Sequence, residues 1–282
     1  MYKRQPLRTL KVSGIKALFL YFVIPSAALA LLAAGVVLKK GLPDRLSTAT
    51  INTAFQFNQI DTTVCPSLVN LGCVGGDKDS TDQVLLYGES HALHYFELVS
   101  RLASDSAMNV KLYATGGCGL KMKSAKCAST RSGYSAELQG GTDISILAFR
   151  WDLDFQDEEF LTELDQLIEE AKSNSKKVVV MAQPPLLNFS PAKIENCNRL
   201  GIPCYKPENT TNELYPTYND VIKDRVTALG VEFFDPFATI SDRSQLYDGD
   251  RLLYSDTDHL SVYGGQWLYK NIAAQESTLL QY

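Results

Sequence analysis

Two short segments of the sequence carry the residue types of nucleophilic catalysis. The first, Gly88–Glu89–Ser90–His91, lies between the apolar run Val84–Tyr87 and a helical pattern. The Ser90 hydroxyl is therefore expected at the carboxyl end of a strand, with its own N–H at a helix N-terminus, where it can stabilise an oxyanion. Gly88 permits a tight turn and a close approach of substrate. The alternative is a serine that only caps the helix.

The second segment, Asp256–Thr257–Asp258–His259–Leu260–Ser261, precedes the last helical pattern of the chain. A serine nucleophile needs a base, and a histidine base needs a carboxylate that fixes its tautomer and stabilises the imidazolium. Asp256 and His259 are close enough in sequence to meet within one loop. The alternative is a solvated turn at the start of the helix, in which Asp258 or Ser261 acts as the cap.

The other two histidines are not expected to bind a metal ion. His91 and His94 are i, i+3 neighbours on one predicted helix, but no acidic or cysteine partner is evident close by in the sequence. We expect a hydrogen bond for His91 at the helix start and partial exposure for His94, and we predict no metal and no cofactor bound by this domain. Tyr247, Tyr254 and Trp267 are expected to pack against the core rather than to stack on sugars.

The elements that must position these residues alternate between strands and helices. The expected strands are short apolar runs at 84–87, 110–113, 144–149, 177–182 and 231–234. The expected helices lie at 91–103, 157–172, 212–229 and 261–274, the third with a break at Pro216. This alternation predicts a three-layer α/β/α sandwich with a parallel sheet of about five strands. Ligands bind such sheets at the carboxyl ends of the strands, where Ser90 is expected.

The N-terminal part of the chain predicts a membrane anchor. Ala17 to Leu38 is apolar and uncharged, and about 20 such residues suffice for a helix to cross the hydrocarbon core. Basic residues before this stretch outnumber those after it, which favours a cytoplasmic N-terminus and an exported domain. A cleaved signal peptide is the alternative, but the stretch is long for one and no clear cleavage site follows it. The expected organisation is a basic cytoplasmic segment 1–16, a transmembrane helix 17–38, a linker with a disulfide loop 39–79 and a catalytic domain 80–282.

The charge of the chain argues against a nucleic-acid partner. The net charge is −5, yet residues 1–40 carry basic side chains and no acidic one. The rest of the chain is therefore strongly acidic and would be repelled by nucleic acid.

Six cysteines fall into three close pairs: Cys65 with Cys73, Cys118 with Cys127, and Cys197 with Cys204. Many pairings of six cysteines are possible, but local pairs in an exported domain predict three small disulfide loops. Zinc is the alternative, and it is disfavoured because no pair has the CxxC spacing and the histidines lie elsewhere.

Together, the two chemical segments resemble the signature of the SGNH (GDSL-like) hydrolase superfamily. Gly88–Glu89–Ser90 matches its Gly-Asp-Ser block and Asp256–His259 matches its Asp-x-x-His block, and the resemblance extends over most of residues 80–275. It implies a flavodoxin-like fold with Ser90 as nucleophile, His259 as general base and acid, and Asp256 as its orienting carboxylate. Glu89 departs from the usual aspartate by one additional methylene.

One branch of the superfamily is especially similar. The segments Gly88–Ala92 and Asp258–Ser261, the cysteine-flanked loops and the pair Arg150–Trp151 resemble the SGNH domain fused behind the integral-membrane acyltransferase-3 (AT3) domain of bacterial polysaccharide O-acetyltransferases. In this branch Arg150–Trp151 stands where the wider superfamily has a Gly-x-Asn block.

The resemblance leaves the oxyanion hole incompletely defined. Its glycine donor is expected among Gly116, Gly117 and Gly119, with Gly117 as the working choice beside the N–H of Ser90. Contacts with substrate or with the catalytic residues are expected from four further positions: Glu89, His91, Arg150 and Trp151.

The resemblance implies transfer of an acyl group, most simply acetyl, to sugar hydroxyls of an exported bacterial polysaccharide through a Ser90 acyl-enzyme. Acetyl-CoA would be the ultimate donor only through a membrane AT3 partner, and the chain would be the C-terminal part of a longer fusion or would act with a separate AT3 protein. The catalytic domain is then expected on the periplasmic side of the inner membrane, anchored in lipid by residues 17–38. The alternatives are an exported carbohydrate O-acetyl esterase and a non-catalytic glycan-binding domain.

Overall fold

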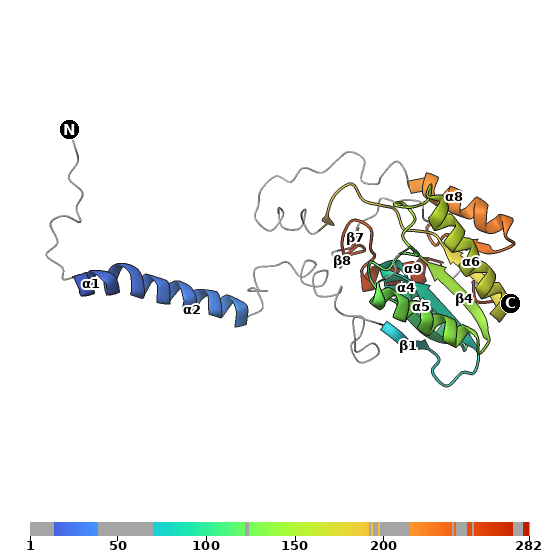
Figure 1. Ribbon diagram of the computed structural model, residues 1–282, viewed down its shortest axis with the longest axis horizontal. Helices are drawn as coiled ribbons and strands as arrows, with labels where there is room; N and C mark the ends of the chain where they lie inside the picture. The colour runs from blue at the N-terminus through green and yellow to red at the C-terminus, as the bar shows by residue number, and fades with distance from the viewer. Residues whose placement is uncertain are drawn as a thin grey trace. The chain divides into compact units, whose positions relative to one another are not determined.

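A computed structural model describes two compact units of the chain, Met1–Ser47 and Thr48–Tyr282 (Figure 1). The residues whose structure is described are 14–38, 70–121, 124–191, 193, 197, 215–238, 240, 247–249, 251–272 and 279–281.

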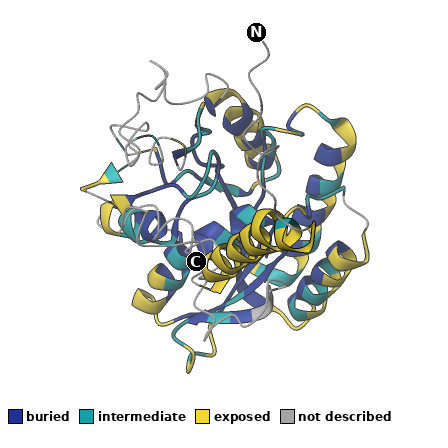
Figure 2. Cartoon of the chain, turned by 90° about the vertical axis from the view of Figure 1, so that its left-hand side faces the viewer, coloured by how far each residue is buried: buried dark blue, intermediate teal, exposed yellow. Residues whose placement is uncertain are grey.

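The first unit contains one long apolar helix. It consists of α1 (Gly14–Leu18), the π-helical segment η2 (Phe19–Val23) and α2 (Ile24–Leu38), and it is long and apolar enough to cross a membrane. Nearly all of its residues are exposed (Figure 2). The π-helical turn ends at Val23, two residues before Pro25, which lacks an N–H and whose ring crowds the preceding turn. The wider turn accommodates the proline without ending the helix.

The second unit is built around a six-stranded sheet in the order β1-β3-β2-β4-β5-β6. The strands are β1 (Asn70–Gly76), β2 (Gln83–Gly88), β3 (Asn109–Ala114), β4 (Thr142–Ala148), β5 (Ser175–Met181) and β6 (Glu232–Phe234). Strands β2 to β6 are mutually parallel, and β1 is an antiparallel edge strand beside β3. The chain places β3 on one side of β2 and then β4 on the other, so β2 is the topological switch point of the sheet.

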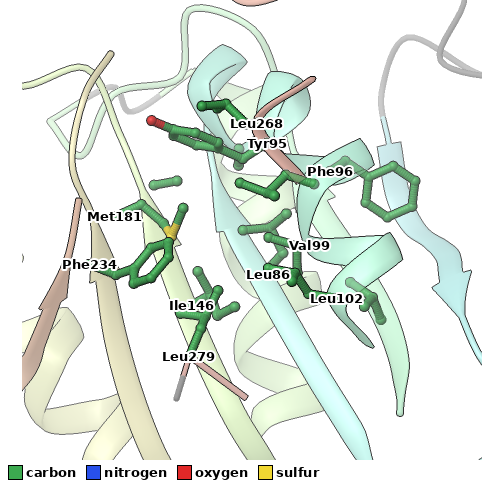
Figure 3. Packing of buried hydrophobic residues seen from close by; sticks show 14 of the residues in the cluster. Leu86, Tyr95, Phe96, Val99, Leu102, Ile146, Met181, Phe234, Leu268 and Leu279 are labelled. Carbon is green, nitrogen blue, oxygen red and sulfur yellow. The ribbon is translucent and has the colours of Figure 1, made fainter. Parts of the chain in front are cut away.

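Helices cover both faces of the sheet, as predicted. Val84 and Leu86 of β2 pack in one cluster with α4 (Ser90–Asp105) and α9 (Val262–Ile272). Leu85 and Tyr87 point to the other face, which is covered by α5 (Ala125–Leu138), α6 (Glu158–Asn174) and α8 (Tyr215–Ala228). Figure 3 shows Leu86 packed beside α4 in the first of these clusters. The predicted three-layer α/β/α sandwich is therefore confirmed.

Two strand features differ from the prediction. β1 lies within the segment expected to be a linker, so the end of that segment belongs to the sheet. Its sequence is rich in glycine, which is typical of turns, but a Cβ on Gly75 would lie 2.2 Å from Ser100 Oγ. Glycine here lets α4 approach the strand closely. A small hairpin of β7 (Tyr247–Asp248) and β8 (Arg251–Leu252) was also not predicted.

Helix α5 was missed, and α8 lacks the break that was predicted at Pro216. The buried residues of α5 are Cys127, Thr130, Tyr134 and Leu138, so polar and small residues interrupt its apolar periodicity. Its clearest local signal is Ser124, the N-cap, which accepts the backbone N–H of Cys127 at 3.3 Å. Pro216 does not break α8, because it occupies the first turn of the helix, where proline is tolerated.

Candidate active site

Ser90 lies at the sharp turn from β2 into α4. The turn requires Gly88, because a Cβ at this position would lie 1.8 Å from the carbonyl oxygen of Ala148 in β4. Glu89 is the residue directly before the helix, and its buried side chain accepts the backbone N–H of Arg150 at 2.8 Å. Ser90 is thereby held at the carboxyl end of the switch-point strand, with its N–H in the first turn of α4.

Ser90, His259 and Asp256 form a continuous hydrogen-bonded chain. Ser90 Oγ lies 2.7 Å from His259 Nε2, although the two residues are 169 positions apart in sequence. On the other side of the ring, His259 Nδ1 lies 2.8 Å from Asp256 Oδ2 and 3.0 Å from Oδ1. Since a carboxylate only accepts, Nδ1–H donates to Asp256 and Nε2 is left to accept the Ser90 hydroxyl proton.

The loop that carries the histidine is fixed from within and from outside. Asp256 Oδ1 accepts the backbone N–H groups of Asp258 at 2.9 Å and of His259 at 2.8 Å. Leu187, in the segment after β5, donates its N–H to the carbonyl of Thr257 at 2.7 Å. The carboxylate therefore shapes the loop as well as orienting the imidazole.

Helix α9 follows this loop directly and is capped by a serine. Ser261 Oγ accepts the N–H of Gly264 at 2.9 Å and donates to the carbonyl of Leu252 at 2.8 Å. A Cβ on Gly264 would lie 2.0 Å from the carbonyl oxygen of Leu253, so a glycine is required where the helix contacts the preceding segment. The serine cap and this contact hold the histidine loop against the core.

The charges around the histidine favour a strong base. Burial by itself lowers the pKa of His259, but the hydrogen bond and charge of Asp256, together with the charge of Asp258, raise it above its ordinary value of 6.5. Burial raises the pKa of Asp256, and the interactions with His259 and two backbone N–H groups outweigh this and lower it. Asp256 is thus an anion beside a histidine that readily accepts a proton.

Arg150 connects the turn that carries Ser90 with the loop that carries His259. Its backbone N–H bonds to Glu89, the residue before Ser90. Its guanidinium group pairs with Asp152 through Nε at 2.8 Å and Nη2 at 3.1 Å, and with Asp258 Oδ2 through Nη1 at 2.7 Å. The structure thus places Arg150 in contact with both segments, and its expected role at the site stays a prediction.

Sequence reasoning missed Asp152 and Gln183, which complete this network. Gln183 Oε1 accepts the backbone N–H groups of Trp151 at 2.6 Å and of Asp152 at 3.0 Å, and its Nε2 donates to Asp152 Oδ1 at 2.7 Å. Their positions in the sequence could have identified them. Asp152 and Gln183 are polar residues that closely follow the buried strands β4 and β5, and the carboxyl ends of these strands form the edge of the sheet that carries the site. Trp151 is fully buried and donates Nε1–H to the carbonyl of Met181 at 3.0 Å, so it supports the site from the core.

His91 and His94 differ from the prediction. Neither ring nitrogen of His91 has a hydrogen-bond partner among the described residues, and His94 is buried rather than partly exposed. Burial lowers the pKa of both side chains well below 6.5, so both are neutral. Their ring centres lie 5.1 and 5.8 Å from that of His259. The first turns of α4 lie between the sheet and α9, and this tertiary contact was not visible in the local sequence.

The described residues include one group with metal-ligand chemistry. His91, Asp258 and His259 each offer a ligand atom within 4.8 Å of the others. However, both ring nitrogens of His259 already face Asp256 and Ser90, and Asp258 pairs with Arg150. A metal ion here would have to displace contacts within the Ser90–His259–Asp256 chain.

The two predicted oxyanion donors, Ser90 and Gly117, follow neighbouring strands at the same edge of the sheet. Gly117 is in the loop after β3, whose last residue, Ala114, pairs with Gly88. Gly117 is exposed and has a φ of 73°, which favours glycine. Its role as the second donor stays a prediction.

The structure contains the Cys118–Cys127 disulfide, which joins the Gly117 loop to the first turn of α5. Cys73 and Cys197 are also disulfide-bonded. Their predicted partners, Cys65 and Cys204, lie outside the described residues, so those two pairings stay predictions.

Comparisons with known proteins give a family and a fold. A family model described as an SGNH domain fused to AT3 domains matches residues 55–274. No protein of the curated set matches the chain at a significant level. A solved periplasmic domain of a lipopolysaccharide acetyltransferase from Salmonella ser. Paratyphi A is similar over 71% of this chain and 85% of its own, with 13% identity and a TM-score of 0.57.

Two further solved structures are similar at lower TM-scores. A protein described as a putative SGNH hydrolase from Slackia heliotrinireducens has 16% identity and a TM-score of 0.47, over 69% of this chain and 98% of its own. A catalytic mutant of an acetylxylan esterase from Geobacillus stearothermophilus has 16% identity and a TM-score of 0.45, over 73% of this chain and 99% of its own.

Proposed function

The chain belongs to the family of SGNH domains that are fused to AT3 domains, and from this premise we propose that it transfers an acyl group, most simply acetyl, to sugar hydroxyls of an exported polysaccharide. Ser90 carries the acyl group as an ester. The observation that supports this most strongly is the Ser90–His259–Asp256 chain, with bonds of 2.7 and 2.8 Å at the carboxyl end of the switch-point strand.

The first half-reaction forms the acyl-enzyme. Ser90 Oγ attacks the carbonyl carbon of the acyl donor while His259 Nε2 takes the hydroxyl proton. The tetrahedral oxyanion is stabilised by the N–H of Ser90 and, as predicted, by that of Gly117. When the intermediate collapses, His259 returns the proton to the leaving oxygen or sulfur of the donor, and Asp256 stabilises the transient imidazolium.

The second half-reaction regenerates the serine. An acceptor hydroxyl gives its proton to His259 Nε2 and attacks the acyl carbon, and the proton then passes to Ser90 Oγ as the ester bond to the enzyme breaks. A sugar hydroxyl as acceptor gives an O-acylated glycan. Water as acceptor gives hydrolysis, so the esterase alternative shares every residue of this mechanism.

The family description supplies the proposed partner. An AT3 domain, in the same longer protein or in a separate one, delivers acyl groups that derive from acetyl-CoA on the cytoplasmic side. The apolar helix Gly14–Leu38 anchors the chain in the inner membrane, with the SGNH domain in the periplasm. This arrangement agrees with the disulfide Cys118–Cys127, since disulfides persist in oxidising compartments.

The test of the proposed chemistry uses the full chain, purified in detergent, with p-nitrophenyl acetate as donor. We expect Ser90→Ala to lower the rate of nitrophenol release by about 10³-fold or more, because the nucleophile of a triad is lost. Ser104→Ala is the matched control, since Ser104 is an exposed serine at the other end of α4. A sulfonyl fluoride should add to the wild type and not to Ser90→Ala, as judged by intact mass.

Transfer is separated from hydrolysis by adding xylotetraose or chitotetraose to the same reaction. Transfer yields acetylated oligosaccharide at the expense of free acetate, as measured by mass spectrometry. If wild type and Ser90→Ala are equally inert and no adduct forms on Ser90, the proposed catalytic function is wrong and the glycan-binding alternative stands.

A further inference from the structure

We propose that Arg150 is a positioning residue that ties the turn carrying Ser90 to the loop carrying His259, and that it forms with Asp258 a charge pair beside the catalytic imidazole. The inference rests on the proposed function, because it assigns His259 as the base.

The first contact of Arg150 is made by its backbone. Arg150 follows β4, and β4 pairs with β2 up to the register Gly88–Ala148. Its N–H reaches the Glu89 carboxylate at 2.8 Å, across 61 positions of sequence. The residue directly before Ser90 is therefore fastened to the end of the neighbouring strand.

The second contact is made by the guanidinium group. Its Nη1 lies 2.7 Å from Oδ2 of Asp258, the residue directly before His259. The opposite edge of the guanidinium is held by Asp152 through two hydrogen bonds of 2.8 and 3.1 Å. Gln183 donates to Asp152 at 2.7 Å, so the carboxylate that orients the guanidinium is itself fixed from the end of β5.

This bonding distinguishes positioning from direct participation in the reaction. Nε, Nη1 and Nη2 of Arg150 all face carboxylate oxygens, and only 28% of the side chain is exposed. Three of its five N–H groups are directed at Asp152 and Asp258, so protein carboxylates fix the orientation of the guanidinium. Its position, with one contact to each catalytic segment, suits it to hold Ser90 and His259 at hydrogen-bond distance.

The pair also has an electrostatic effect with a definite sign. Asp258 Oδ1 lies 3.7 Å from His259 Nδ1, and its negative charge raises the pKa of His259, whereas the positive charge of Arg150 lowers it. Removing the cation must therefore raise the pKa of His259, and removing the anion must lower it. Among the residues that the structure describes, the titratable and charged groups that face His259 include Asp256 and Asp258 from its own loop, Arg150 from the end of β4, and Glu89, His91 and His94 from the start of α4.

The experiment compares Arg150→Gln, Arg150→Lys, Asp258→Asn and the double variant Arg150→Gln/Asp258→Asn in the full chain in detergent. Arg150→Gln keeps the backbone N–H that bonds to Glu89 and removes only the charged guanidinium group. Arg225→Gln is the matched control, because Arg225 makes an equally good pair with Asp165, at 2.8 and 2.7 Å, between α8 and α6. The pKa of His259 is measured by NMR of labelled histidines, which number only three in the chain.

We expect Arg150→Gln to raise the pKa of His259, Asp258→Asn to lower it, and the double variant to return toward the wild type. Arg150→Lys keeps the charge but not the planar fork, so it should leave the pKa near that of the wild type and still reduce turnover. For p-nitrophenyl acetate, kcat should fall by about 10- to 100-fold in Arg150→Gln with KM unchanged, as expected for a misplaced base. Arg225→Gln should change neither quantity.

The inference is overturned if Arg150→Gln leaves both kcat and the pKa of His259 at their wild-type values, or if Arg150→Gln and Asp258→Asn shift the pKa in the same direction. Should Arg150→Gln fail to fold, as judged by circular dichroism, Asp258→Asn and Arg150→Lys test the same pair by the same criteria. A wild type that is as inert as Ser90→Ala refutes the proposed function. The NMR titrations then still decide whether Arg150 and Asp258 act on His259.

Discussion

At the scale of single residues, the structure brings together two short segments that are each a weak signal in the sequence. One carries Ser90 and the other carries Asp256 and His259. Ser90 and His259 are separated by 169 positions, and each segment alone is compatible with a helix cap. The contact between Ser90 Oγ and His259 Nε2 links the two segments, as expected from the resemblance. Glu89, which departs from the usual aspartate, is bonded through its carboxylate to the backbone N–H of Arg150 at 2.8 Å.

The state of His259 leads to a prediction about pH. The pKa of His259 is raised above 6.5, and the residue acts as a base only when neutral. Nitrophenol release should therefore be low below this pKa and should rise with pH through a point above 6.5. Asp256→Asn removes the main group that raises this pKa, so the rise should move to lower pH while kcat falls by on the order of 10⁴-fold. A pH–rate profile of both proteins measures this, and a rise that moves to higher pH in Asp256→Asn would contradict the assignment.

The supporting residues show where sequence reasoning ends at this scale. Ser90, Asp256 and His259 belong to short segments with recognisable local chemistry. Arg150 was a candidate only through the family resemblance. Asp152 and Gln183 act through contacts between the ends of different strands, and no local spacing records such contacts. His94 was misjudged for the same reason, since its burial depends on the packing of α4 between the sheet and α9.

At the scale of elements, the parallel strands were predicted because each contains or adjoins a short apolar run, and most residues of these runs are buried. β1 and α5 were not, because glycines in one and serine and alanine in the other remove the periodicity on which the prediction depends. The elements that position Ser90 are thus the ones with the clearest pattern in the sequence. The edge strand and the helix on the opposite face required the structure.

The close packing of β2 against β4 predicts a strong effect of a single methyl group. Gly88→Ala would place a Cβ 1.8 Å from the carbonyl oxygen of Ala148, a backbone atom that cannot move without disturbing the sheet. We expect a loss of about 1–3 kcal/mol in the free energy of unfolding, measured by urea denaturation, together with loss of esterase activity.

Gly116→Ala is the matched control for this variant, because nothing lies within 4 Å of a Cβ at that position. It should unfold at nearly the wild-type urea concentration. Equal stability of the Gly88→Ala and Gly116→Ala proteins would show that the turn before Ser90 tolerates a side chain, against the structure described above.

At the scale of the whole molecule, the chain combines a helix with no buried residue and a domain with a complete hydrophobic core. An exposed apolar helix of this length is costly in water, so a lipid bilayer is its natural environment. The anchor and the cleaved signal peptide differ in one observable, the mass of the mature protein. Because the apolar helix is long enough to span a bilayer, we expect the mature protein to retain Gly14–Leu38, and its mass will show whether it does.

The last prediction concerns the strength of this anchor. An arginine in place of Leu29, near the middle of α2, costs about 2.5–3.5 kcal/mol for insertion at the centre of a bilayer. Leu29→Arg should therefore shift the protein from the carbonate-resistant membrane fraction toward the soluble fraction, whereas Leu29→Phe, which stays apolar, should not. Intact mass of the membrane fraction checks that the helix is retained. If Leu29→Arg fractionates like the wild type, or if the mature protein lacks residues 14–38, the anchor is wrong and the domain reaches its substrate without it.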